Sequence, residues 1–406
     1  MKMASQFNTL PQSLTAKVEP YTLHVSNKDL LDFKELLRLS PIGPSTWWNQ
    51  HKNGRYGISR DWLINAKETW LSSFNWRSHE EHINNFPNFK IAIKDHEAGD
   101  VSVHFTALFS KRKDAIPVVF LHGYPGSFVE FLPMLQLLVE KYTPDTLPYH
   151  VIVPSLPDYG LSSGASENVE MTLERSARIL NQLMVDLGFG GGYIAQGGDL
   201  GSMLARLMSV RFEECKAFHI NMLALNPDQI PPSPRDDIAP KDAEHLKRSE
   251  VWQQTGFAYA LEHATRPATI GLAISSSPIA LLSWIGEKLL EWVDPRHPLP
   301  LDTILGMVTL WWFTSTLPRS LYHAELVKKL MSGKPHEIST EKPMGYSLFE
   351  YDLALVPEAW VRELYPNLVA FNRHDPGAHF ASLEQPQLLL DDVEGFIEAV
   401  KGRGIF

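Results

Sequence analysis

An apolar strand runs into a glycine-rich turn at residues 193–201, Tyr193-Ile194-Ala195-Gln196-Gly197-Gly198-Asp199-Leu200-Gly201. Gly197 and Gly201 lie two residues before and after Asp199, which is the spacing of a nucleophile elbow, a motif that usually carries serine. Glycine is required there because the nucleophile is held in a strained conformation on a sharp strand-to-helix turn, where larger neighbours would collide. Taken alone, the segment is equally compatible with an Asp-Gly turn in which Asp199 caps the helix predicted at 202–209.

Composition and net charge narrow the class of protein. The 406 residues are 44% hydrophobic and 21% charged, as in an ordinary globular protein. The formal net charge of −10 argues against a nucleic-acid partner, because there is no basic excess to offset phosphates. A single cysteine, Cys215, excludes an intrachain disulfide and fits a reducing compartment.

We also expect a soluble, cytoplasmic protein without a membrane anchor. The first residues, Met1–Asn8, lack the apolar core of a signal peptide. Residues 268–286 carry no charge and are nearly long enough to span a bilayer. Because four serines, Gly271 and Pro278 interrupt this segment, it predicts a buried helix pair.

Strand patterns begin at about Val101, where Val101, Val103 and Phe105 alternate with polar residues. Apolar runs follow at 116–121, 150–153, 193–196 and 216–220, with helical spacing at 128–141 and 172–187. This alternation predicts a mostly parallel central sheet with helices on both faces. In such sheets, functional residues gather at the carboxyl ends of the strands.

The sequence divides into four predicted segments. Residues 1–100 form an N-terminal helical and irregular region, rich in tryptophan, that packs on the core and lid, and residues 101–222 form the first part of the sheet domain. At 223–342 the alternation stops, and long amphipathic stretches predict an inserted helical lid. Residues 343–406 return to strand patterns and close with a helix at 386–401.

Asp199, Asp352 and His379 follow the chain order nucleophile, acid, histidine, each after a predicted strand. That order, with a lid between nucleophile and acid, predicts an α/β-hydrolase fold with a catalytic triad. Glu350 competes for the acid role, but Asp352 lies further along the loop, beyond the buried strand. His374 competes for the base, but His379 stands between small residues in a turn before a helix.

No cofactor or metal is expected. The chain has no Walker A sequence and no cluster of His, Cys and carboxylates with metal-ligand spacing. Gly190, Gly191, Gly192 and Ala195 match a dinucleotide fingerprint, but they precede a strand instead of following one, so the structural context of that motif is missing.

Further motifs span nearly the whole chain: Trp47-Trp48, Phe86-Pro87-Asn88-Phe89-Lys90, His122-Gly123-Tyr124-Pro125-Gly126-Ser127, the elbow at 197–201, and Gly377-Ala378-His379-Phe380 with Glu384 and Pro386. Together and in this order they resemble the microsomal-type epoxide hydrolases, in particular the soluble fungal members. Three positions depart from the family pattern. Family members often have Trp where Tyr124 and Leu200 stand, and Gly where Ala378 stands.

The resemblance implies a reaction in which Asp199 attacks a hydrophobic epoxide and forms an ester. A water deprotonated by His379, itself oriented by Asp352, then hydrolyses the ester to a vicinal diol. The backbone N–H groups of Tyr124 and Leu200 would bind the oxyanion. His122, Gly123 and Pro125 support that loop, and Gly197 and Gly201 support the elbow.

The resemblance also implies two lid tyrosines, Tyr259 and Tyr322, that donate a proton to the opening epoxide oxygen. Relatives and the aromatic N-terminal region make a homodimer plausible. Two alternatives stay open at this point. A haloalkane dehalogenase would use the same Asp nucleophile, but Leu200 removes one expected indole donor. A non-catalytic small-molecule receptor could share the fold.

Overall fold

The computed structural model describes residues 4–51, 54–225, 238–321 and 339–406. One nine-stranded sheet runs through the molecule in the order β1-β2-β3-β5-β4-β6-β7-β8-β9. The strands are β1 (Val18–Tyr21), β2 (Asn88–Asp95), β3 (Gly99–Leu108), β4 (Ile116–Leu121), β5 (Tyr149–Pro154), β6 (Tyr193–Gly197), β7 (Cys215–Ile220), β8 (Met344–Phe349) and β9 (Leu368–His374).

In sheet order, the six strands β5-β4-β6-β7-β8-β9 are parallel to one another. The strands β1, β2, β3 and β5 pair antiparallel, each with the next. Every residue of β4, β6 and β8 is buried, as expected for strands covered on both faces. Within this core, Ser347 Oγ and His219 Nε2 are within hydrogen-bond distance, at 3.1 Å. This mostly parallel sheet confirms the predicted α/β class.

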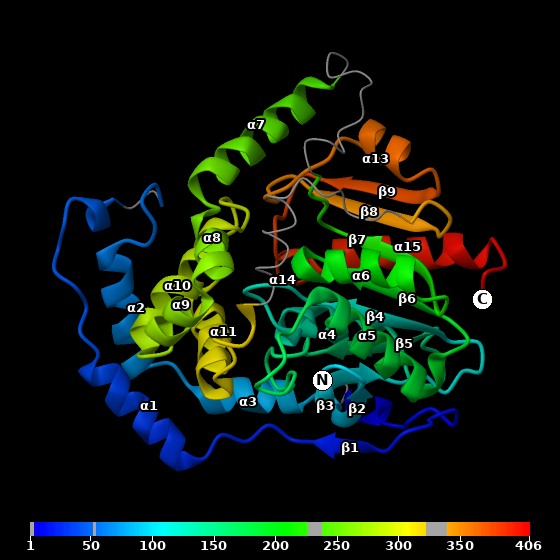
Figure 1. Cartoon of the computed structure of the whole chain (residues 1–406), viewed down its shortest axis with the longest axis horizontal. Helices are drawn as coiled ribbons and strands as arrows, with labels where there is room; N and C mark the ends of the chain where they lie inside the picture. The colour runs from blue at the N-terminus through cyan, green and yellow to red at the C-terminus, as the bar shows by residue number, and fades with distance from the viewer. Residues whose placement is uncertain (1–3, 52–53, 226–237, 322–338) are drawn as a thin grey trace.

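Helices cover both faces of the sheet (Figure 1). They include α4 (Leu132–Lys141), which packs on α15 (Pro386–Lys401), and α5 (Leu173–Met184), which packs on α6 (Asp199–Arg211). The apolar stripe of α5 explains its position, since it buries Leu173, Ile179 and Leu183. Two shorter helices, α13 (Glu358–Leu364) and α14 (Ala381–Glu384), flank β9.

The N-terminal region is not only helical, which corrects the prediction for residues 1–100. The strands β1 and β2 lie in it and extend the sheet through β3. In β2, Phe89, Ile91 and Ile93 are buried and alternate with more polar residues, a strand pattern that helical spacing cannot match. The sheet therefore begins well before Val101.

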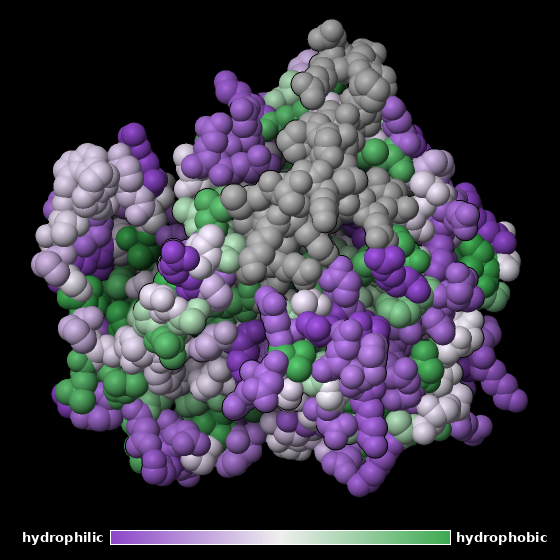
Figure 2. Space-filling model, viewed as in Figure 1, coloured by the Kyte–Doolittle hydropathy of each residue, from purple (hydrophilic) through white to green (hydrophobic). Residues whose placement is uncertain are grey.

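Three N-terminal helices lie against the lid: α1 (Asn27–Leu39), α2 (Arg60–Ser72) and α3 (Trp76–Asn84). Trp70 Nε1 donates a hydrogen bond of 2.9 Å to Thr309 Oγ1 of the lid. The predicted packing of aromatic side chains thus holds for Trp70 but not for the Trp47-Trp48 pair, since each of these indoles is 60% exposed. Figure 2 shows hydrophobic residues gathered between these N-terminal helices and the lid, on a face that is otherwise mostly polar.

The lid lies between the N-terminal helices and the sheet (Figure 1). Its described helices are α7 (Pro240–Thr255), α8 (Ala258–Thr265), α9 (Pro267–Ile274), α10 (Pro278–Glu291) and α11 (Leu301–Thr314). The uncharged segment is the predicted helix pair: α9 and α10 meet at a bend of 113°. Among the described residues no single helix has the length and apolarity to cross a bilayer, and only this bent pair passes such a test jointly.

Candidate active site

The turn between β6 and α6 holds Asp199 in a strained conformation, with φ of +48°. Non-glycine residues rarely adopt positive φ, and such strain is typical of functional positions. The turn can be this tight because a Cβ on Gly197 would lie 2.2 Å from the carbonyl carbon of Gly201. A Cβ on Gly201 would lie 1.9 Å from the carbonyl oxygen of Leu121. Strand and helix thus approach closely, as the elbow motif predicts.

Three side chains from separate segments meet at this turn. Nδ1 of His379 lies 2.9 Å from Oδ1 of Asp352, and Nε2 of His379 lies 3.4 Å from Oδ2 of Asp199. The first distance is that of a hydrogen bond, and the second is that of an ion pair without a well-formed hydrogen bond. Leu353 N–H also donates to Oδ1 of Asp352 at 2.7 Å. The structure therefore brings together the three residues predicted as a triad.

Burial and charge act in opposite directions on these groups. Burial lowers the pKa of His379, but its contacts with Asp199 and Asp352 outweigh burial and raise this pKa to about 10. Burial raises the pKa of Asp199, but His379 and the N–H groups of Leu200 and Tyr124 hold it below its ordinary value. At neutral pH, Asp199 is therefore an anion beside a cationic His379.

The loop after β4 supplies backbone donors to Asp199. Tyr124 N–H donates a hydrogen bond of 2.7 Å to Oδ1 of Asp199, and Leu200 N–H donates to the same carboxylate. His122 fixes this loop: its Nε2 accepts from Leu156 N–H at 3.1 Å. Burial lowers the pKa of His122 to about 4, so the imidazole is neutral and able to accept. Two N–H groups thus converge on one carboxylate.

The two competing residues have other partners. Glu350 hydrogen bonds to His245 and forms an ion pair of 2.8 Å with Lys241, and both of these partners lie on the lid helix α7. His374 Nε2 lies 2.7 Å from Oδ2 of Asp392 on α15. Glu350 and His374 thus pair with residues outside the triad. The geometry favours Asp352 over Glu350 as the acid and His379 over His374 as the base.

Tyr259 on α8 lies over the site. Its ring stacks on the Tyr124 ring, with centroids 5.6 Å apart and planes at 14°, and it contacts Trp292 at 5.3 Å. Burial raises the pKa of Tyr259 well above its ordinary value, and the negative charge of Asp199 adds to this, so the phenol keeps its proton. Lys288 places its ammonium 5.0 Å from the centre of the same ring. The other predicted tyrosine, Tyr322, lies outside the described residues.

Sequence reasoning assigned no role to three residues that hold the loop carrying His379. Trp292 accepts a backbone hydrogen bond of 3.1 Å from His379 N–H. Asp294 accepts from Gly377 N–H at 3.1 Å, and Glu384 accepts from the N–H groups of Phe380 and Asp294 at 3.0 and 2.8 Å. Glu384 stood in the motif around His379 and could have been noticed there. The contacts of Trp292 and Asp294 with this loop join segments that are far apart in sequence, so no local pattern reveals them.

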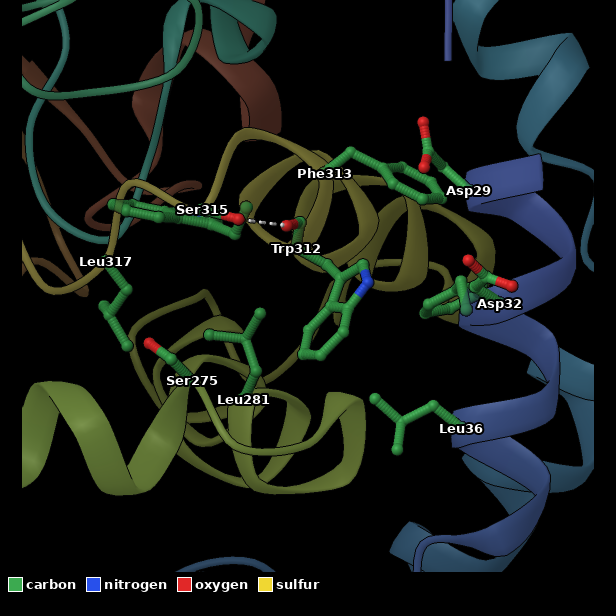
Figure 3. Close-up of a pocket in the computed structure, with 11 residues that line it drawn as sticks. Asp29, Asp32, Leu36, Ser275, Leu281, Trp312, Phe313, Ser315 and Leu317 are labelled. Carbon is green, nitrogen blue, oxygen red and sulfur yellow. Dashed lines mark hydrogen bonds between the residues drawn. The ribbon is translucent and has the colours of Figure 1, made fainter. Parts of the chain in front are cut away.

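Two cavities differ in size and in contents. The smaller, which Asp199, His379 and Glu130 help to line, leaves about 10 Å³ open to the centre of a water molecule. Figure 3 shows the other, of about 290 Å³, where α1 faces the lid helices; Phe33, Leu36, Leu281, Trp312 and Phe313 line it, with Asp29 and Asp32 from α1. None of Asp199, Asp352 and His379 lines this larger cavity. We therefore locate the candidate active site by these three side chains and not by cavity size. Among the described residues, no three His, Cys, Asp or Glu side chains are placed so that they could hold a metal ion.

Comparisons with known proteins agree with this geometry. The family model for the epoxide hydrolase N terminus matches residues 18–131, and the model for the alpha/beta hydrolase fold matches residues 116–271. The solved epoxide hydrolase of Aspergillus niger is 46% identical, covers 97% of this chain and 99% of its own, and has a TM-score of 0.90. A candidate epoxide hydrolase of Dothistroma septosporum is 42% identical over 98% of this chain and 94% of its own length. Epoxide hydrolase 1 of Sus scrofa is 27% identical over 94% of this chain and 88% of its own length.

Proposed function

This chain belongs to the epoxide hydrolase family and is an epoxide-hydrolysing enzyme with an α/β-hydrolase fold, and we propose that it converts hydrophobic epoxides to vicinal diols through a covalent ester on Asp199. The observation that carries the proposal is the placement of Asp199 between backbone donors and an imidazolium. Oδ1 is held by Tyr124 N–H at 2.7 Å, and Oδ2 lies 3.4 Å from Nε2 of His379. A carboxylate held in this way is a positioned nucleophile.

In the first step, one carboxylate oxygen of Asp199 attacks an epoxide carbon, and the carbon–oxygen bond of the strained ring breaks as the ester forms. The epoxide oxygen, now an alkoxide on the esterified substrate, takes the phenolic proton of Tyr259 and becomes the first hydroxyl of the product. Ester formation removes the negative charge of Asp199, one of the groups that raise the pKa of His379. The imidazolium therefore becomes more acidic and returns a proton to the phenolate of Tyr259.

In the second step, neutral His379 takes one proton of a water whose oxygen adds to Cγ of Asp199. The resulting oxyanion lies between the N–H groups of Tyr124 and Leu200, and removing one such donor typically costs about 3–4 kcal/mol in the barrier. The tetrahedral species then breaks its bond to the diol oxygen. The water's second proton passes from the new carboxyl group to that alkoxide, which restores anionic Asp199 and cationic His379.

Asp352 stabilises the imidazolium of His379 and fixes the tautomer of the neutral imidazole, because a carboxylate that accepts from Nδ1–H leaves Nε2 facing the reacting groups. Tyr259 is the proton donor that the described residues support, and Tyr322 is the second donor implied by the family resemblance. The surroundings of Tyr259 are aromatic, formed by Tyr124, Trp292 and Phe257, and such a lining favours a hydrophobic substrate.

We also propose that the enzyme is a homodimer, since Trp47 and Trp48 each expose 60% of their surface and large exposed aromatic groups mark many interfaces. Analytical ultracentrifugation of wild type and Trp47→Ser/Trp48→Ser would test this, and an unchanged sedimentation coefficient would contradict it. The cytoplasmic location and the absence of a membrane anchor stay predictions, which fractionation of the producing cells would test.

The test of the ester route is one single turnover with styrene oxide in oxygen-18 water, followed by mass analysis of the peptide that contains Asp199. Heavy oxygen in the Asp199 carboxylate and an unlabelled diol are expected, because the water adds to the ester carbonyl and not to the substrate. Label in the diol with none in the protein would mean direct attack by water, and Asp199 would lose its role as nucleophile.

A further inference from the structure

A second carboxyl group, that of Glu130, lies in the site without any role in the reaction described so far. Glu130 belongs to the short 3-10 helix Phe128–Phe131 and is only 8% exposed. Its electrostatic interactions include those with Asp199 and with His379. Among the described residues, no side chain or backbone group donates a hydrogen bond to its carboxyl oxygens. Burial of a carboxyl group without a partner is costly, so its position requires an explanation.

The loop after β4 is shaped to admit this carboxyl group. A Cβ on Gly126 would lie 2.1 Å from Oε2 of Glu130, so only glycine leaves room for the carboxyl there. In the same loop, a Cβ on Gly123 would lie 2.3 Å from Oδ1 of Asp199. The two glycines of this loop therefore make room for two carboxyl groups.

The small cavity joins these groups. Glu130, Asp199 and His379 all line it, and the space open to the centre of a water molecule is about 10 Å³. This is about the space that one buried water needs, and a buried water generally makes two to four hydrogen bonds. A single water there would reach the base, the carbon it must attack, and a carboxyl group that has no donor from the protein.

We propose that Glu130 is a positioning residue for the hydrolytic water: its carbonyl oxygen accepts one water proton in a hydrogen bond, while His379 Nε2 takes the other and the water oxygen faces Cγ of Asp199. This inference rests on the proposed ester route. The step balances as described above, because Glu130 neither gains nor loses a proton. Its effect is confined to ester hydrolysis, since no water takes part in ring opening.

The protonation state of Glu130 suits this role. Burial raises the pKa of Glu130 to about 8, and the negative charge of Asp199 acts in the same direction while cationic His379 opposes it. At pH 7 the group is therefore mostly a neutral acid, which still has a carbonyl oxygen that accepts. A glutamine side chain has the same shape and the same accepting oxygen, whereas methionine has a similar length and no such acceptor.

The experiment separates the two chemical steps in Glu130→Met, Glu130→Gln and the neighbouring control Val129→Ala. Purified enzyme in excess is mixed with styrene oxide at pH 7, quenched at millisecond intervals, and measured as intact protein by mass, which gives the rates of ester formation and decay. Glu130→Met should slow ester decay on the order of 10- to 100-fold, as expected for a misplaced reactant, with ester formation unchanged. Glu130→Gln and Val129→Ala should decay at rates close to that of wild type.

Several outcomes would overturn the inference. Decay at the wild-type rate in Glu130→Met would show that the water needs no such acceptor. An equal loss of both steps in Glu130→Met and Glu130→Gln would show a structural role only. Should the methionine variant fail to fold, Gly126→Ala tests the same contact, since its added Cβ displaces the Glu130 carboxyl. A wild-type enzyme that forms no ester at all would instead overturn the proposed route itself, and this inference with it.

Discussion

Nδ1 of His379 lies 2.9 Å from Oδ1 of Asp352, and neither residue exposes more than 5% of its surface. This pair sets the imidazole so that Nε2 faces Asp199. In the resting site, both carboxylates raise the pKa of His379 to about 10. In the proposed ester the negative charge of Asp199 is absent, so that only Asp352 would continue to raise that pKa. On the proposed route, the same imidazole is therefore a cation before ring opening and a base after it.

The first prediction concerns His379→Gln. Ring opening needs only the Asp199 carboxylate and a proton donor, whereas ester hydrolysis needs a base, so the ester should form and persist. General-base removal typically costs 10²–10⁴-fold, and we expect ester decay to slow by about that factor. Intact-protein mass spectrometry after mixing with excess styrene oxide checks this. The expected signal is a stable increase of one substrate mass, and Asp199→Asn should show no increase.

The second prediction compares two carboxylates of the loop after β8. Asp352→Asn should slow ester hydrolysis on the order of 10³–10⁴-fold, because an amide cannot stabilise the imidazolium and favours the wrong tautomer. Glu350→Gln is the matched control, since Glu350 faces Lys241 and His245 on the lid. Rapid-quench kinetics of both variants give the hydrolysis rate. A larger loss in Glu350→Gln than in Asp352→Asn would reverse the assignment of the acid.

Much of the fold was predictable because its strands carry their own signals. The apolar run at Ile116–Leu121 has the same bounds in the structure as in the sequence pattern. Apolar residues on both faces of a strand are a local property that needs no knowledge of partners. The elbow is also local, because Gly197, Asp199 and Gly201 fall within one turn. These signals sufficed to predict the fold class and to single out Asp199 as the candidate nucleophile.

Other features depend on partners that are distant in sequence. The short strand β1 contains Pro20 and exists only through pairing with β2, so no pattern within Val18–Tyr21 reveals it. Glu130 lies among apolar residues of an ordinary helical pattern, and only the folded chain places it against His379 and Asp199. The Trp292 carbonyl that holds His379 is a backbone group, and side-chain chemistry in the sequence carries no information about it.

The third prediction concerns the proton donor. Tyr259→Phe removes the phenolic hydroxyl and keeps the ring that stacks on Tyr124, so ring opening should slow by about 10²-fold at unchanged ester decay. Stopped-flow measurement of ester formation checks the first rate. Combining it with Tyr322→Phe should be much worse than either change alone. Tyr351→Phe is the control, because the Tyr351 ring lies against the guanidinium groups of Arg248 and Arg296.

The fourth prediction concerns stability in acid. Asp294 is fully buried and accepts from Arg296 at 2.8 Å and from Gly377 N–H at 3.1 Å, which ties the segment after α10 to the loop carrying His379. Burial raises the pKa of Asp294, but Arg296 and the backbone donors outweigh it and lower the pKa from 3.8 to about 2. A depressed pKa means that the anion stabilises the folded state, so this contribution is present above about pH 4 and is lost as pH falls towards 2.

Asp294→Asn resembles the protonated form and should therefore be less stable than wild type at pH 7, by about 1–3 kcal/mol for a buried charged acceptor. Urea unfolding at pH 7, 5, 4 and 3 measures the difference, which should be constant from pH 7 to 5 and should shrink below about pH 4. Glu35→Gln serves as a control, because Glu35 pairs with Arg38 on the exposed side of α1 and should change stability little at any pH. A difference between wild type and Asp294→Asn that is as large at pH 3 as at pH 7 would mean that the Asp294 charge contributes nothing to the anchoring of the His379 loop.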